Sequence, residues 1–116
     1  MSNPVMHFEL MGKDAIALQK FYADVFDWKL SPPIAEMGNY SLLDKDGNCI
    51  GGGIGEGDAR VTVYIEVDDP QAYLDRAEKA GATVMMPVST ITENTTIALF
   101  SDPAGNITGL LKAQPG

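Results

Sequence analysis

One pattern occurs twice in this sequence and limits the folds that it can adopt. The segment Val5–Leu10 alternates apolar and polar residues, a helical spacing of apolar residues follows, and a short apolar segment comes next at Trp28–Leu30. The same order begins again at Val61. Alternation is typical of a half-buried strand, and apolar residues at i, i+3, i+4 and i+7 are typical of an amphipathic helix. The repeat therefore predicts two modules of one type.

The first module is expected to contain one helix. Asp14 is its predicted N-cap, and the helix ends near Asp27. Its predicted apolar stripe consists of Leu18, Phe21, Tyr22 and Val25.

Three short strands are expected after this helix. They are Trp28–Leu30, which Pro32 and Pro33 interrupt, and the segments 39–43 and 49–54. A turn at Asp44–Asn48 is predicted to join the last two as a hairpin, because an Asp-Gly step lies between two apolar segments.

The second module is expected to repeat this order. A strand at Val61–Val67 precedes a helix that Asp69 caps. The segment Thr83–Met86 is predicted as a strand that Pro87 stops, and a hairpin pairs residues 95–100 with residues 106–111.

These elements predict an α+β fold of two βαβββ modules in a single domain, residues 1–116. Module one spans about residues 4–57 and module two about residues 58–113. Each helix is expected to cover the apolar face of its own sheet. The polar faces are then left to curve around a shared cleft.

Charge and composition exclude several classes of partner. The formal charge is −8, which disfavours nucleic acid and anionic membrane surfaces. The start of the sequence lacks a signal-peptide pattern, and no apolar run approaches the length of a membrane span. Without a signal-peptide pattern, a cytoplasmic location is expected. The single cysteine excludes a disulfide framework.

Five short motifs match one known superfamily over most of the chain. They are His7-Phe8-Glu9, Phe21-Tyr22, Val25-Phe26-Asp27-Trp28, Lys79-Ala80-Gly81-Ala82 and Asp102-Pro103-Ala104-Gly105-Asn106. The sequence resembles the vicinal oxygen chelate superfamily, which includes glyoxalase I, bleomycin resistance proteins and extradiol dioxygenases. The resemblance implies this fold and a homodimer, and it specifies activity much less, because the superfamily hosts several chemistries and some non-enzymes.

The resemblance also implies where a metal would bind. Members with metal take one ligand from the first strand and one from the last strand of each module. The matching positions here are His7, Gly51, Thr62 and Gly109, and of these only His7 has a metal-binding side chain. We therefore expect no metal, with a divalent ion held by His7 as the alternative.

Four residues are candidates for acid–base chemistry. His7 has the only side chain whose unperturbed pKa lies near neutrality, and Glu9 lies beside it on the same strand face. Tyr64 and Glu66 on the matching strand are candidates for an acid or an orienting group. The alternative is that His7 is a former ligand that now only bonds to a neighbour.

Six further residues are candidates for ligand binding. The glycines would leave the polar faces without side chains, so that the space could hold an organic ligand or be filled by a neighbouring side chain. The candidates are Gly51, Gly53, Thr62, Gly109, Tyr40 and Met85.

The leading hypothesis is a glyoxalase-like or bleomycin-resistance-like protein that binds a small organic molecule in the cleft without metal. One alternative is a metal-dependent lyase or dioxygenase that uses His7 as a ligand. Another is a non-catalytic subunit whose cleft is vestigial.

Overall fold

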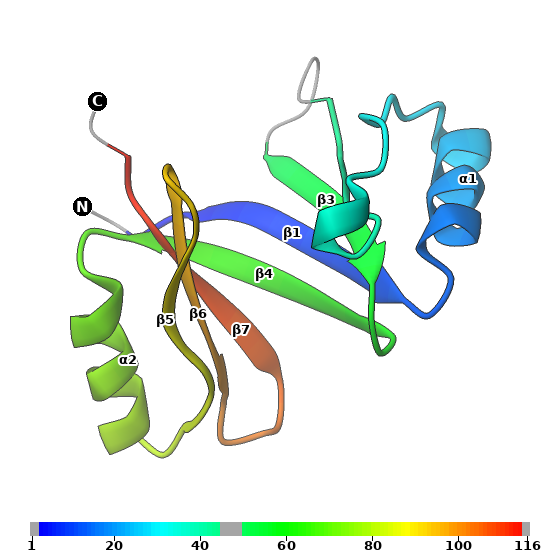
Figure 1. Ribbon diagram of the computed structural model, residues 1–116. Helices are drawn as coiled ribbons and strands as arrows, with labels where there is room; N and C mark the ends of the chain where they lie inside the picture. Colours follow the sequence, from blue (N-terminus) through cyan, green and yellow to red (C-terminus); the bar gives the residue numbers. More distant parts are fainter. Residues whose placement is uncertain (1–2, 45–49, 115–116) are drawn as a thin grey trace. The chain divides into compact units, whose positions relative to one another are not determined.

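The computed structural model describes residues 3–44 and 50–114, and the chain forms two compact units. Residues 7–61 form the β1–β3 unit; residues 62–116, together with the first six residues, form the β4–β7 unit. Both contain strands and one α-helix, which confirms the α+β class (Figure 1). The single domain with a shared cleft stays a prediction.

The β1–β3 unit contains a short mixed sheet. Its elements are β1 (Val5–Gly12), α1 (Ala15–Phe26), the 3-10 helix η1 (Ala35–Met37), β2 (Ser41–Leu42) and β3 (Gly51–Glu56). Strand β3 pairs with β1 in parallel and with β2 in antiparallel orientation. Of the predicted turn at Asp44–Asn48, residues 45–48 lie outside the described residues.

Helix α1 begins and ends near the predicted residues. The Asp14 carboxylate accepts a hydrogen bond from the Ala17 N–H at 3.0 Å, which satisfies one of the free donors of the first turn. At the other end, Asp27 adopts a left-handed conformation, φ 58°, and its N–H donates to the Ala23 carbonyl at 2.9 Å. Both predicted ends of the helix are confirmed.

The predicted apolar stripe of α1 is only partly correct. The buried residues of the helix are Ala15 and Gln19, whereas Phe21 is 55% exposed and Val25 53% exposed. The Gln19 amide donates to the carbonyls of Ile54, at 2.9 Å, and Asn39, at 2.7 Å. These two bonds hold the Gln19 side of the helix towards β3, so part of the stripe faces away.

The strand predicted at Trp28–Leu30 is reduced to one isolated bridge, between Leu30 and Leu43. Proline lacks the N–H that a strand ladder needs, and Pro32 and Pro33 follow directly. Trp28 instead packs its ring on Tyr22, with centroids 5.5 Å apart, and on Phe8, at 5.9 Å. It is a packing residue of this unit.

The β4–β7 unit has the predicted βαβββ order. Its elements are β4 (Arg60–Val67), α2 (Pro70–Lys79), β5 (Thr83–Thr92), β6 (Thr95–Ser101) and β7 (Ile107–Lys112), and the strand order is β4-β7-β6-β5. Helix α2 contacts β5, β6 and β7. The core between helix and sheet consists of Val67, Leu74, Ala98 and Leu110.

Strand β5 is longer than predicted. It continues through Pro87 to Thr92, so the expected stop at Met86 is wrong. β5 lies at the edge of this unit's strand order, and its pairing with β6 has register shifts between Val84 and Thr92. An irregular edge strand tolerates a proline because its N–H side need not pair.

The turn between β6 and β7 is held by one carboxylate. Asp102 accepts hydrogen bonds from the backbone N–H groups of Ala104 and Asn106, both at 2.9 Å, and from the Asn106 side chain at 3.0 Å. The Asn106 side-chain bond, followed by the Asn106 backbone bond, lowers the pKa of Asp102. Gly105 completes the turn at φ 96°.

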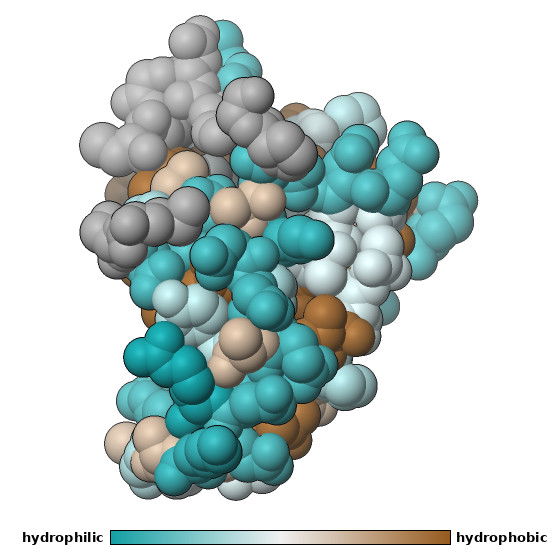
Figure 2. Space-filling view, turned by 90° about the vertical axis from the view of Figure 1, so that its left-hand side faces the viewer, coloured by the Kyte–Doolittle hydropathy of each residue, from teal (hydrophilic) through white to brown (hydrophobic). Residues whose placement is uncertain are grey.

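The surface on the side of α2 is mainly hydrophilic, with small hydrophobic patches between polar side chains (Figure 2). No helix among the described residues is long and apolar enough to cross a membrane.

Candidate functional site

The parallel pairing of β1 and β3 builds one face with few side chains. His7 pairs with Gly51, and Glu9 pairs with Gly53. Alternate residues of a strand point to the same side, so His7 and Glu9 share a face with these glycines. Phe8 lies on the opposite face, where its ring covers Gly52.

Tyr40 lies over the glycine side of this face. A Cβ atom built on Gly53 would overlap the Tyr40 hydroxyl and ring, and one on Gly55 would come within 2.5 Å of the same ring. The segment before β2 holds Tyr40 there, because the Ile34 N–H donates to the Tyr40 carbonyl at 2.9 Å. Of the two alternatives for this space, a neighbouring side chain fills it at Gly53.

Four side chains form a continuous polar chain on this unit. His7 Nε2 lies 3.0 Å from the Tyr40 hydroxyl, which donates to Glu9 Oε2 at 3.0 Å. Arg60 binds the other carboxylate oxygen, Oε1, at 3.1 Å. Glu9 is only 8% exposed, so Arg60 compensates a buried carboxylate. This chain is called the His7–Arg60 array below.

The array fixes the direction of its protons. A hydroxyl has one proton, and Tyr40 gives it to Glu9, which as an ion-paired carboxylate can only accept. Tyr40 must then accept from His7, which places a proton on Nε2.

The predicted residues of the second module lie in the β4–β7 unit. Tyr64 pairs with Gly109, and its ring lies where a Cβ of Gly109 would be. The Tyr64 side chain therefore fills the space over Gly109. Thr62 lies on the same strand face and is buried, and its hydroxyl has no hydrogen-bond partner among the described residues.

The other two candidates in this unit differ in setting. Glu66 is half-buried on β4, where its N–H donates to the Pro4 carbonyl at 2.8 Å. Met85 lies on the edge strand β5 and is 53% exposed. The structure thus brings His7, Glu9, Tyr40, Gly51 and Gly53 together in one unit. Met85 belongs to the other unit, where β5 is the edge strand.

Arg60 is the member of the His7–Arg60 array that the sequence pattern did not indicate. It lies in the polar segment before Val61. Tyr40 was expected as a pocket lining, and its hydroxyl joins the array. A buried carboxylate on β1 requires a cation, but nothing in the local pattern identifies which cation supplies it.

A family comparison identifies the fold. Residues 8–111 match the family model described as a glyoxalase-like domain. This chain belongs to the glyoxalase-like family. The resemblance to the vicinal oxygen chelate superfamily is confirmed, and the family membership does not specify a particular activity.

Curated relatives of this glyoxalase-like chain are longer proteins. CFP32 of Mycobacterium tuberculosis, provisionally named a glyoxylase, is 31% identical over 91% of the chain and 44% of its own length. The anthracycline biosynthesis protein DnrV of Streptomyces peucetius is 30% identical over 84% of the chain and 42% of its own length. The chain spans less than half of either relative.

Solved structures share the fold at low identity. Methylmalonyl-CoA epimerase from Mycobacterium tuberculosis has a TM-score of 0.69 at 14% identity and covers 96% of this chain and 88% of its own. A glyoxalase/bleomycin resistance protein/dioxygenase superfamily member from Vibrio splendidus 12B01 has a TM-score of 0.67 at 18% identity and covers 95% and 98%. These likenesses show the fold alone.

The residues around His7 do not fit a catalytic metal site. Such a site usually takes three protein ligands, and no group of three His, Cys, Asp or Glu side chains that could hold a metal occurs in the described part of the chain. Both Glu9 oxygens and His7 Nε2 are engaged in the array, and the Arg60 cation lies 3.1 Å from the carboxylate. A second cation beside Glu9 would be repelled.

Proposed function

We propose that this glyoxalase-like protein binds a small organic carbonyl compound beside the β1–β3 face and that His7 exchanges a proton with it. The observation that carries the proposal is the His7–Arg60 array, which orients the only histidine of the sequence on a face of glycines. Histidine is the side chain best suited to proton transfer near neutral pH.

The proposed chemistry needs no metal. His7 takes a proton from the carbon next to the carbonyl group, and the imidazolium that forms is stabilised through Tyr40 by the Glu9 carboxylate. The same proton, or one from water, returns to the carbon.

The family supports the substrate class only in outline. CFP32 carries a glyoxylase name, and one solved relative is a methylmalonyl-CoA epimerase in complex with methylmalonyl-CoA. The chain spans less than half of the curated relatives. Any activity that such a longer protein has as a whole therefore comes to this chain only as a proposal.

Binding is tested first by thermal shift with a panel of α-keto acids, α-keto aldehydes and 2-hydroxy acids. A ligand that binds only the native state raises the melting temperature as its concentration increases. Exchange of the ligand's C–H with D₂O is then followed by proton NMR. His7→Gln should slow this exchange by about 100-fold or more, because a general base contributes at least that much.

Two further variants make the test specific. Tyr40→Phe removes the hydroxyl between His7 and Glu9, so the pH profile of exchange should change while ligand binding persists. Tyr22→Phe removes a hydroxyl from α1 in the same unit and should leave exchange unchanged. Unchanged exchange in His7→Gln would remove His7 from the mechanism, and stoichiometric metal in protein purified without chelators would favour the metal-dependent alternative.

We also propose that two copies pair through α1, as a homodimer is expected from the superfamily. The apolar side chains of Ile16, Phe21, Val25 and Phe26 are each 51–55% exposed on this helix. Contiguous exposed apolar patches are uncommon on monomers and often mark interfaces, and a two-fold pair would cover the same patch on both copies. The cytoplasm is the proposed location, because the single cysteine cannot form an intrachain disulfide.

Light scattering coupled to size-exclusion chromatography tests the pairing. The double variant Phe21→Gln with Phe26→Gln should convert a dimer into a monomer. Ile91→Gln removes an exposed apolar side chain from β5 and should leave the mass unchanged. A monomeric wild-type protein at tens of micromolar concentration would contradict the proposed interface.

A further inference from the structure

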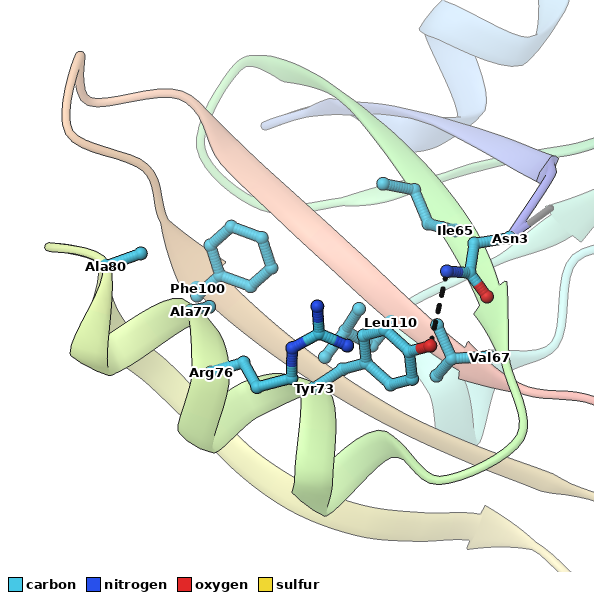
Figure 3. Close-up of a pocket in the computed structure, with 9 residues that line it drawn as sticks. All are labelled: Asn3, Ile65, Val67, Tyr73, Arg76, Ala77, Ala80, Phe100 and Leu110. Atoms are coloured by element: carbon cyan, nitrogen blue, oxygen red, sulfur yellow. Dashed lines mark hydrogen bonds between the residues drawn. The ribbon is translucent and has the colours of Figure 1, made fainter. Parts of the chain in front are cut away.

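A groove lies between α2 and the sheet of the β4–β7 unit (Figure 3). Its volume is about 490 Å³, which lies within the range of small-molecule sites. The floor comes from β4, β6 and β7, and the wall comes from α2. The lining side chains of floor and wall are Ile65, Val67, Phe100, Leu110, Tyr73, Ala77 and Ala80.

The spacing of residues on α2 explains why the groove is open. Tyr73, Ala77 and the C-cap residue Ala80 follow one another at i, i+4 and i+7, so they lie on the same side of α2 and its end. Alanine at the last two positions leaves space over Phe100 that a larger side chain would fill. The result is an apolar floor beside the closed core of the unit.

The rim of the groove carries one cation. The Arg76 guanidinium lies 4.9 Å from the centre of the Tyr73 ring, which restricts its position. No carboxylate pairs with Arg76 within residues 3–44 and 50–114, although the protein carries a net charge of −8. Asn3, on the same rim, donates its amide to the Tyr73 hydroxyl at 3.3 Å, which holds that ring in place.

We propose that this groove binds an amphipathic monocarboxylate, with its apolar tail on the floor and its carboxylate on Arg76. An apolar floor alone would accept any hydrophobic molecule, but a guanidinium with no carboxylate partner selects an anionic head group, because its N–H donors match two carboxylate oxygens. The site uses none of the residues of the His7–Arg60 array and goes beyond the proposed function.

The test is an NMR titration of the full chain with sodium octanoate. The methyl signals of Ile65 and Leu110 and the ring signals of Phe100 should shift with saturation, and those of Ile16 in the β1–β3 unit should not. 1-Octanol and octylammonium chloride serve as matched probes. Both should bind about tenfold or more weakly, since they lack the charge-assisted bond to Arg76.

Three variants locate the site. Arg76→Gln should weaken octanoate binding by about tenfold or more and leave octanol binding unchanged. Lys79→Gln, which removes a cation from the same helix outside the groove, should bind octanoate like the wild type. Ala77→Leu keeps a good helix former and fills the groove, so it should abolish binding of both octanoate and octanol.

Each contrary outcome overturns the proposal. Octanoate that leaves the groove signals unmoved at millimolar concentration shows that no such site exists. Equal affinity for octanoate and octylammonium would show that the carboxylate is not recognised. Unchanged octanoate binding in Ala77→Leu would show that the ligand does not bind in the groove. Proton exchange at His7 is measured separately, so failure here leaves the proposed function standing.

Discussion

Single residues decide the character of the β1–β3 face, and glycine is the most influential of them. Gly53 pairs with Glu9 and leaves room for the Tyr40 ring, whose hydroxyl then joins the His7–Arg60 array. A methyl group at this position would occupy the place of the ring. The array therefore depends on a residue that contributes no side chain to it.

Gly53→Ala should destabilise the protein by about 1–3 kcal/mol, because the added Cβ displaces the Tyr40 ring and forces repacking. Urea denaturation measures this free energy of unfolding. In a Tyr40→Ala background the same substitution should cost little, since the space is then empty. Equal costs in the two backgrounds would show that Tyr40 does not occupy this position.

Asp102 predicts a pH dependence of stability. Its pKa is lowered in the folded state by hydrogen bonds from Asn106, so its contribution is present above the unfolded pKa, near 3.9, and is lost as pH falls through the folded value. Asp102→Ala should lower the melting temperature at pH 7. The difference from the wild type should shrink below about pH 4. A difference that grows in acid would contradict this assignment.

At the level of elements, the sequence predicted the helix ends correctly, because neighbouring residues determine them. Asp14 and Asp69 were expected to cap the two helices, and both accept the hydrogen bond of an N-cap. The extent of β5 was missed, because Pro87 stops a strand only where its N–H side must pair. The partly exposed stripe of α1 was also missed, since the bonds of Gln19 to β3 are long-range contacts that helical spacing does not encode.

The two caps offer a matched test. Asp14→Ala and Asp69→Ala should each reduce the free energy of unfolding by about 1 kcal/mol, because each leaves a helix donor unsatisfied. Asp24→Ala is the control. Asp24 accepts a hydrogen bond from Lys20 on the surface of α1, raising the Lys20 pKa, and exposed pairs of this kind contribute little. Thermal and urea unfolding distinguish these results.

For the whole molecule, the sequence predicted most of the order of elements. It predicted the candidate site only in part. The structure pairs His7 with Gly51, two of the positions that the resemblance singled out. In the second module the structure pairs Gly109 with Tyr64, which lies two residues from Thr62. Arg60 could not be predicted, because its partner Glu9 lies far away in the sequence and only the folded unit brings the two together.

The net charge of −8 gives a prediction that concerns the molecule as a whole. Duplex DNA and anionic vesicles should not bind the protein at physiological salt, because the summed field repels them. Gel-shift and vesicle sedimentation measure this. Binding of either one that weakens steeply as salt is raised would reveal a local basic surface that outweighs the total charge.

On the β1–β3 face, the hydrogen-bonded backbone of the strands and the side chain that covers it come from different segments of the chain. Strand β3 supplies only backbone beside His7 and Glu9, while Tyr40 arrives from the turn segment that precedes β2. Replacing that turn segment with a different one would change the side chains on this face and leave the pairing of β1 with β3 intact. Diversification of such a protein can proceed by editing one short connection, in the way that antibodies vary their loops.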